Sequence, residues 1–200
     1  SIVIPAYNEE RFVGTLLERI RAVDLESEGL RGEVIVVDDC SADRTGEIAA
    51  AVPGVVLVRH EQNGGKGRAV RTGLDRAAGD YVIIQDADLE YDPDDYLPML
   101  KTLLAGEADA VYGSRYLPCP ERGALANLLR GKHPDQSLLA YLGGQSLSFV
   151  CLFFTGRYLT DTVTAFKLFR AADIKGLDLK TTGFELDHEI TAKLLARGRS

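Results

Sequence analysis

The stretch YVIIQDADLEYDPDD, residues 81–95, joins an apolar run to a dense group of carboxylates. Four apolar residues between polar neighbours are typical of a buried strand, and open α/β sheets bind ligands at the carboxyl ends of their strands. Because side chains alternate along a strand, Asp86, Asp88 and Glu90 are expected on one side. Three carboxylates this close repel one another unless a cation neutralises them, and hard oxygen ligands favour Mg²⁺ or Mn²⁺. The stretch therefore predicts a strand that ends at a divalent-metal site.

The alternative is a solvated acidic turn that caps a helix beginning near Pro93. Asp94 and Asp95 fit this alternative, since acidic residues in a first helical turn interact favourably with the helix dipole. Asp86 and Asp88 follow the apolar run directly, and that position favours a functional role for both.

Outward from this stretch, strand patterns alternate with helical patterns. Besides 81–84, strands are predicted at 1–5, 34–37, 55–58, 108–112 and 162–169. Helices are predicted to open at Asn8, to follow Ser41 and Asp43 as capping residues, to follow the loop 61–68, and to span 93–104 and 184–195. This alternation predicts an α/β fold with right-handed crossovers and a mostly parallel sheet between two layers of helices. The apolar positions of the last predicted helix are expected to be Phe184, Ile190, Leu194 and Leu195.

A second pair of carboxylates, Asp38 and Asp39, follows the predicted strand that ends at Val37. Such carboxylates can accept hydrogen bonds from a base N–H or from ribose hydroxyls. The loop EQNGGKGR, 61–68, places Lys66 among glycines, which suggests a phosphate site, but it matches neither the P-loop nor GxGxxG. The glycines fit equally well with a plain turn that needs positive φ.

The residues after the first strand exclude one class of enzyme. PAYNEE, residues 5–10, stands where a dinucleotide fingerprint would be, which argues against hydride transfer with a nicotinamide cofactor. A diphosphate ligand held through a metal remains, because the metal can stabilise a departing diphosphate as a Lewis acid. This chemistry suits the transfer of a sugar from a nucleoside diphosphate.

Charge is divided unevenly along the 200 residues. Residues 1–110 carry 11 Lys and Arg against 22 Asp and Glu, residues 111–200 carry 12 against 8, and the net charge is −7. The division is either accidental or favours an anionic substrate bridged between the halves, and the net charge argues against nucleic acid as a partner.

Cys40, Cys119 and Cys151 lack the spacing of a zinc site or a disulfide framework, which fits a reducing cytoplasm.

Two segments after Pro118 differ from the rest. Residues 119–136 are rich in Pro, Gly and charge, which predicts a loop or mobile flap. Residues 137–156 hold no charged residue and are either a buried helix or a surface that meets lipid. Cations lie on either side of this segment, at Arg115, Arg130, Lys132, His133 and Arg157.

The chain opens inside a predicted strand with neither a signal peptide nor an initial Met, so we expect a fragment or a trimmed form.

Five motifs occur in an order and spacing that are known together from one family. They are PAYNEE (5–10), VVDDCSADRT (36–45), NGGKGRAVRTG (63–73), QDADLEYDP (85–93) and GSRY (113–116). The chain resembles a family 2 glycosyltransferase with a GT-A fold, and within it the polyprenyl-phosphate sugar synthases of the dolichyl-phosphate mannose or glucose type. DTVTAFKLFR (161–170) and GFELDHEITAKLLARG (183–198) extend the resemblance, which leaves 119–145 uncovered. VTAF departs from the commoner Ser-Gly or Thr-Gly pairing, and the hydrophobic helices that often follow the catalytic domain lie outside these residues.

The resemblance implies a role for each group of motif residues. Donor-binding residues would be Pro5, Tyr7, Glu9, Val37, Asp38 or Asp39, Lys66, Asp86 and Lys167, with the first three and an aspartate of the pair lining the nucleoside pocket. The metal ligands would be Asp86, Asp88 and Glu90. Catalysis would involve Asp88 and Arg115, and Asp187 or Glu185 would serve as a base if one is needed, with helix capping as the alternative for these two.

The implied reaction is an inverting, Mg²⁺- or Mn²⁺-dependent transfer of a hexose from GDP-mannose or UDP-glucose to a polyprenyl or dolichyl phosphate. One GT-A domain of residues 1–200 would bind the nucleotide sugar with residues 1–115 and the acceptor with 116–200, at the cytoplasmic face of a membrane. A polyprenyl phosphate is already an oxyanion at neutral pH, so a strong base is unnecessary. The alternatives are a soluble phosphorylated or hydroxyl acceptor and a non-catalytic nucleotide-sugar-binding protein.

Overall fold

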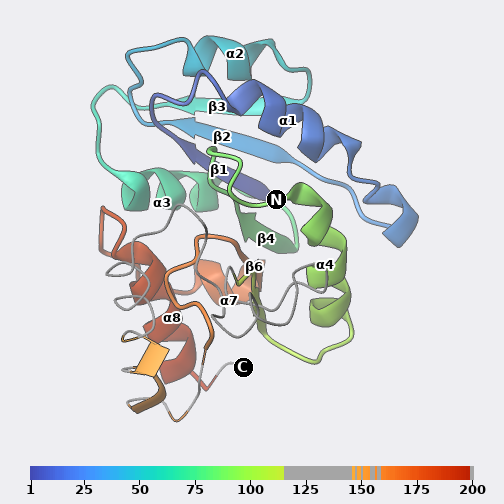
Figure 1. The fold of residues 1–200 in the computed structure, drawn as a ribbon, viewed down its shortest axis with the longest axis vertical. Helices are drawn as coiled ribbons and strands as arrows, with labels where there is room; N and C mark the ends of the chain where they lie inside the picture. The colour runs from blue at the N-terminus through green and yellow to red at the C-terminus, as the bar shows by residue number, and fades with distance from the viewer. Residues whose placement is uncertain (115–145, 147, 150, 154–155, 157–158, 199–200) are drawn as a thin grey trace, which may run out of the picture.

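The computed structural model describes residues 1–114, 146, 148–149, 151–153, 156 and 159–198 (Figure 1). In this part of the chain, six strands form one sheet in the order β3-β2-β1-β4-β6-β5. The strands are β1 (Ile2–Ala6), β2 (Val34–Asp38), β3 (Val55–Arg59), β4 (Tyr81–Ile84), β5 (Ala110–Tyr112) and β6 (Lys167–Arg170).

The sheet is mostly parallel, as the sequence predicts. β1 to β4 pair in parallel, whereas β6 lies antiparallel between β4 and β5. The predicted strand 162–169 is wrong in its first half, because only Lys167–Arg170 enters the sheet. Thr164 explains the difference: its hydroxyl accepts from the backbone N–H of Phe166 and donates to the Tyr91 hydroxyl, a local pattern that competes with strand pairing.

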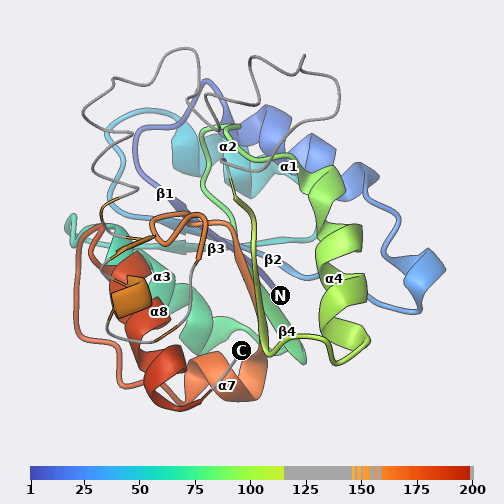
Figure 2. The same cartoon turned by 60° about the horizontal axis from the view of Figure 1, so that its bottom comes forward.

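Helices cover both faces of the sheet, which confirms the predicted layering (Figures 1 and 2). One apolar core joins the sheet to α1 (Val13–Ala22), α2 (Thr45–Ala51) and α4 (Tyr96–Leu104). A second core, on the other face, joins it to α3 (Lys66–Arg76), α7 (Ala171–Lys175) and α8 (Leu186–Ala196). Two short 3₁₀ helices, η1 (Glu26–Glu28) and η2 (Pro93–Asp95), lie in the connections.

One predicted helix start is wrong, and the other is confirmed for one of its two capping residues. Asn8 has a positive φ of 58°, so α1 begins only at Val13. For α2, Ser41 provides no cap, whereas the carboxylate of Asp43 accepts from the backbone N–H of Thr45, the first residue of the helix, at 3.0 Å and caps it as predicted. The Ser41 and Asp43 side chains also accept from the backbone N–H groups of Asn8 and Glu10. The loop after β2 therefore holds the loop after β1 in place.

The helix that contains Ile190 and Leu194 buries both residues as predicted. Phe184 was expected to share that apolar face, but it precedes α8 and its side chain is 75% exposed. The first core position of α8 is Leu186, which is 1% exposed.

Candidate functional site

A cavity of about 380 Å³ opens at the carboxyl ends of β1 and β4, beside the loop after β2 and the start of α3. This is the edge at which the sequence predicts the ligand. The cavity is lined by Pro5, Ala6, Tyr7, Glu9, Asp39, Asn63, Gly65, Lys66, Ala69, Asp86, Ala87, Asp88 and Phe184.

The carboxylates after β4 are arranged differently from the prediction. The strand ends at Ile84 and the chain turns, with Leu89 at a φ of 63°, so strand alternation does not carry Asp86, Asp88 and Glu90 onto one side. Asp86 and Asp88 line the cavity, while Glu90 is exposed and is not part of the lining.

Glu9, from the loop after β1, lines the cavity together with the carboxylates of Asp39, Asp86 and Asp88. Its pKa is raised first by burial and then by the negative charges of Asp88 and Asp86, which lie close enough to act on it. Within the described residues, no three His, Cys, Asp or Glu side chains are grouped to hold a metal ion by themselves. Mg²⁺ in nucleotide sites needs no such group, since it keeps several waters and binds one or two carboxylates together with substrate phosphates. Asp86 and Asp88 fit a site of that kind.

Lys66 is the cation of the cavity, and it belongs to a chain of four alternating charges. Its Nζ lies 2.8 Å from Asp86 Oδ1 and 3.6 Å from Asp187 Oδ2. The other oxygen of Asp187 lies 3.2 Å from Nζ of Lys167, whose side chain is fully buried. Burial alone would lower the pKa of Lys66, but the carboxylates of Asp86 and Asp187 outweigh burial and raise it. The cavity therefore holds a charged lysine that is paired with two carboxylates.

None of Asp187, Lys167 and Glu185 lines the cavity, although Asp187 contacts the lining residue Lys66. Asp187 is 4% exposed between two lysines, and burial lowers the pKa of Lys167, with the attraction of Asp187 as a partial offset. Glu185 is exposed and accepts from the backbone N–H of Gly183, and hydrogen bonds from backbone N–H groups lower its pKa. Arg115 lies outside the described residues.

The backbone N–H groups of the glycine-rich loop and of the first turn of α3 donate to acceptors within the protein. The N–H groups of Gly64 and Gly65 donate to the carboxylate of Asp39, and those of Gly67 and Arg68 donate to the carbonyl oxygen of Thr182. Gly65 has a φ of 84°, and a Cβ there would stand 2.5 Å from that same oxygen. These contacts favour the plain turn over a backbone cradle for phosphate, and Lys66 enters the cavity through its side chain.

Of the predicted pair after β2, Asp39 reaches the cavity and Asp38 does not. Asp38 is fully buried, accepts from the backbone N–H of Ser41 at 2.8 Å and lies 3.2 Å from Arg59 Nε. Asp39 lies 2.6 Å from Nδ1 of His60. Val37 is fully buried in the core that packs against α3, and it does not line the cavity.

Three residues in or next to the cavity were not predicted as site residues: His60, Asn63 and Phe184. Nε2 of His60 lies 2.9 Å from the Thr72 hydroxyl, so the ring bridges α3 and Asp39, and Nδ2 of Asn63 donates to the Asp39 carbonyl. One signal was present for His60: it is the first polar residue after β3, as Asp39 and Asp86 are near the ends of their strands.

The loop 178–183, which contacts the glycine-rich loop, is fixed by Arg71 and Glu189. Arg71 donates to the carbonyl oxygens of Leu179 and Thr181 at 3.2 and 3.1 Å. Glu189 accepts from the backbone N–H groups of Lys180 and Thr181 and pairs with Lys193 at 2.6 Å. Although burial acts in the opposite direction, these hydrogen bonds lower the pKa of Glu189 to about 2.

We expect Glu189→Gln to lower the melting temperature at pH 7 by roughly 3–6 °C. The reason is that weakening hydrogen bonds to a charged acceptor costs about 1.5 kcal/mol of folding free energy. The folded pKa of about 2 lies below the ordinary 4.5, so this stabilisation is complete above pH 4.5 and is lost as the pH falls toward 2. Thermal unfolding followed by circular dichroism at pH 7 and pH 3 should therefore show a smaller difference at pH 3. Glu18→Gln, at an exposed position of α1, is the control; an equal difference at both pH values would contradict the assignment.

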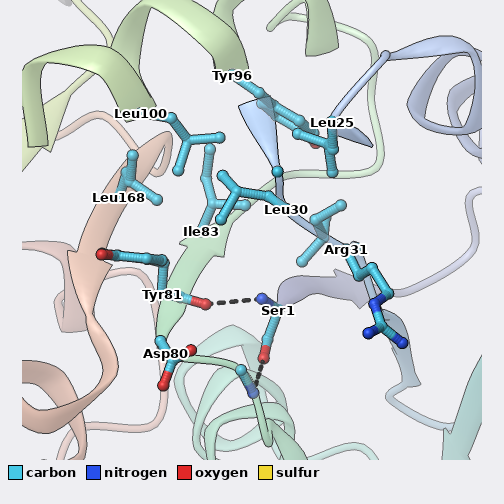
Figure 3. A pocket seen from close by; sticks show the side chains of 14 residues that line it. Ser1, Leu25, Leu30, Arg31, Asp80, Tyr81, Ile83, Tyr96, Leu100 and Leu168 are labelled. Carbon is cyan, nitrogen blue, oxygen red and sulfur yellow. Dashed lines mark hydrogen bonds between the residues drawn. The ribbon is translucent and has the colours of Figure 1, made fainter. Parts of the chain in front are cut away.

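A second cavity, of about 290 Å³, lies at the opposite edge of the sheet (Figure 3). Its walls are mainly apolar, and the Ser1 amino group donates to the Tyr81 carbonyl there at 2.7 Å. Asp80 is the carboxylate of its lining, so the grouped carboxylates and the paired lysine mark the first cavity as the candidate site.

The described part of the uncharged segment favours a surface over a core. Phe149, Leu152 and Phe153 are 61%, 36% and 85% exposed. Among the described residues, the helices are all too short or too polar to cross a membrane. The predicted flap 119–136 lies outside the described residues, and so do the cations Arg130, Lys132, His133 and Arg157.

Comparison with known proteins identifies similar chains. A family model described as "Glycosyl transferase family 2" matches residues 1–165. The dolichol-phosphate mannosyltransferase of Pyrococcus furiosus is 32% identical over 196 residues, 96% of this chain and 52% of that protein. The dodecaprenyl-phosphate galacturonate synthase of Rhizobium johnstonii is 33% identical over 184 residues, 90% of this chain and 50% of that protein. This chain thus spans about half the length of these two relatives.

A solved structure supports the same fold. Glucosyl-3-phosphoglycerate synthase from Mycobacterium tuberculosis, in complex with Mn²⁺, uridine diphosphate and glucosyl-3-phosphoglycerate, is similar with a TM-score of 0.67 at 25% identity. The match covers 98% of this chain and 64% of that one. The predicted fold class, GT-A, is confirmed by this likeness together with the mixed sheet between helices.

Proposed function

The chain belongs to glycosyl transferase family 2, and from that membership we propose that it transfers a hexose from a nucleoside-diphosphate sugar to a polyprenyl phosphate. The observation that carries the proposal is the cavity in which Asp86, Asp88 and Lys66 converge beside Asp39. A nucleotide sugar requires three kinds of group: carboxylates that bind a metal, a cation that binds phosphate, and a hydrogen-bond acceptor for the nucleoside. The named relatives include enzymes of polyprenyl-phosphate sugar transfer.

The donor site is assigned to residues 1–115. Pro5, Tyr7 and Asp39 would hold the nucleoside, with Asn63 supporting Asp39 from its loop. The diphosphate would lie toward Asp86 and Lys66. UDP is the nucleotide in the similar mycobacterial structure, so UDP sugars are the first donors to test, and GDP sugars the second.

Mg²⁺ or Mn²⁺ fits the donor set of Asp86 and Asp88, with Glu9 close to both and Glu90 outside the cavity lining. When bound, the metal would stabilise the negative charge that develops on the leaving diphosphate. Lys66 would contribute to the same end as a point charge, since the diphosphate can replace Asp86 as its partner.

The acceptor is assigned to residues 116–200 and the reaction is proposed to invert the anomeric centre. The phosphate of a polyprenyl phosphate attacks as an oxyanion, so the reaction needs no strong base. The positions of Asp187, buried between two lysines, and of Glu185, with a lowered pKa, are consistent with a site that lacks one. Peripheral contact with the cytoplasmic face of a membrane would bring the site to its lipid.

A soluble phosphorylated acceptor is the second candidate, because the similar mycobacterial enzyme was crystallised with glucosyl-3-phosphoglycerate. Incubation of the protein with UDP and GDP sugars, Mn²⁺ or Mg²⁺, and either polyprenyl phosphate or 3-phosphoglycerate separates the two. A lipid-linked product supports the first proposal. Sugar transfer to phosphoglycerate alone would replace it with the second, and binding without turnover would leave a non-catalytic protein.

The exposed aromatic side chains Phe149 and Phe153 are proposed to contact the lipid surface. We expect the double variant Phe149→Asp and Phe153→Asp to lose association with liposomes and transfer to polyprenyl phosphate, since both rings are exposed and carboxylates oppose insertion among lipids. UDP affinity and melting temperature should stay unchanged, as neither residue lines the cavity. Sedimentation with liposomes and calorimetry with UDP measure both. Val56→Asp, at an exposed apolar position of β3, is the control; unchanged sedimentation of the double variant would contradict the assignment.

A further inference from the structure

Phe184 combines an exposed ring with a place in the candidate site. Single exposed apolar side chains are common and need no explanation by themselves. Phe184, however, lines the cavity, and the Lys66 ammonium lies 5.3 Å from its ring centroid. The ring is therefore directed at the charged part of the cavity and leaves most of its area uncovered.

The backbone that carries Phe184 is fixed from several directions. The carbonyl oxygen of Thr182 accepts from Gly67 at 2.7 Å, and Arg71 holds the carbonyl oxygen of Thr181 at 3.1 Å. A Cβ on Gly67 would stand 2.6 Å from that Thr181 oxygen, so glycine is required for the loop to approach α3 this closely. Such anchoring gives an exposed ring a defined position before any ligand arrives.

Lys66 indicates which part of a nucleotide sugar meets the ring. Its Nζ binds Asp86 at 2.8 Å, at the end of the cavity assigned to the diphosphate, and the same Nζ faces Phe184. Tyr7, 50% exposed, supplies a separate aromatic ring after β1 for the nucleoside. The group that follows the diphosphate in a nucleotide sugar is the hexose, whose C–H bonds form an apolar face that packs on aromatic rings.

We propose that Phe184 is the platform on which the hexose of the donor packs, an inference that rests on the proposed function and names the sugar-contacting residue of its site. The ring would distinguish a nucleotide sugar from the free nucleotide, because the nucleotide alone leaves it uncovered. It would act by positioning the sugar beside the diphosphate, with no proton transfer of its own.

Calorimetric titration of Phe184→Ala in the presence of Mn²⁺ tests the proposal. The wild-type protein first decides which pair is used, UDP with UDP-glucose or GDP with GDP-mannose. The affinities for the nucleotide and for the nucleotide sugar are then compared within that pair. We expect the affinity for the nucleotide sugar to fall about tenfold, the affinity for the nucleotide to stay within about twofold, and Phe184→Tyr to restore both. Phe153→Ala, 85% exposed and outside the cavity lining, is the matched control.

The remaining outcomes each contradict the platform. Equal losses for nucleotide and nucleotide sugar would assign the ring to the nucleoside or to holding Lys66, and no loss for either would show that it contacts no part of the donor. A lower melting temperature with weaker binding of both would make Phe184 structural. If the wild type binds neither pair, the proposed function itself fails, and the inference fails with it.

Discussion

Asp86→Asn is expected to reduce the Mn²⁺-dependent affinity for UDP by roughly 100-fold or more, because outer-shell partners of a metal alone are worth 10–100-fold. Asparagine keeps the shape of the side chain and removes the charge that pairs with Lys66 and that would bind a divalent cation. Calorimetric titration of UDP with Mn²⁺ and with a chelator measures the change. Asp94→Asn, at an exposed position of η2, is the control for a general loss of negative charge.

The same measurement decides which carboxylate completes the metal site. Glu9 lines the cavity and Glu90 does not, so Glu9→Gln should weaken Mn²⁺-dependent binding while Glu90→Gln leaves it unchanged. The reverse result would restore the three-carboxylate group expected from QDADLE. UDP binding that is equally tight with chelator and with Mn²⁺, in wild type and in Asp86→Asn, would remove the metal from the site.

Asp187→Asn is expected to destabilise the protein by about 3–5 kcal/mol, the usual effect of removing one partner of a buried ion pair. Lys167 is fully buried 3.2 Å from Asp187 and would be left with an uncompensated charge. For a chain of this length, the melting temperature should fall by roughly 6–20 °C. Thermal unfolding measures the loss, and Asp178→Asn, whose side chain is 82% exposed beside Lys180, should change it little.

A double variant separates the structural role of Asp187 from a catalytic one. Lys167→Met with Asp187→Leu removes both buried charges and should recover most of the lost stability, since apolar pairs often replace buried ion pairs without loss. A base would behave differently: Asp187→Asn would abolish transfer and leave the melting temperature unchanged.

The fold was predictable as far as it depends on local pattern. The apolar runs at 34–37, 55–58 and 81–84 each became strands, because a short β-loop-α unit encodes its own strand and crossover. β6 could not be predicted in the same way. Its direction is set by pairing between residues far apart, such as Tyr81 with Arg170, and its start is set by hydrogen bonds of Thr164.

The candidate site was predictable where a residue directly follows a strand. Asp39, Asp86 and Asp88 lie in the cavity for that reason, and the family resemblance places Tyr7 and Glu9 there as well. Glu90 was misplaced because β4 ends at Ile84 and the chain turns with Leu89 at a φ of 63°, so strand alternation does not extend to Glu90. His60 contacts Asp39 and Thr72, which are 21 and 12 residues away along the chain, and Phe184 contacts Lys66 from a distant part of the chain. No local pattern encodes such contacts.

The ion pair between Lys66 and Asp86 has a consequence for the order in which ligands arrive. A divalent cation that enters alone must displace an ammonium group 2.8 Å from its carboxylate, so metal without nucleotide should bind weakly. A diphosphate gives the displaced lysine a new partner, which removes that cost. Metal and nucleotide should therefore bind with positive cooperativity, and by thermodynamic reciprocity each will raise the affinity of the other by the same factor.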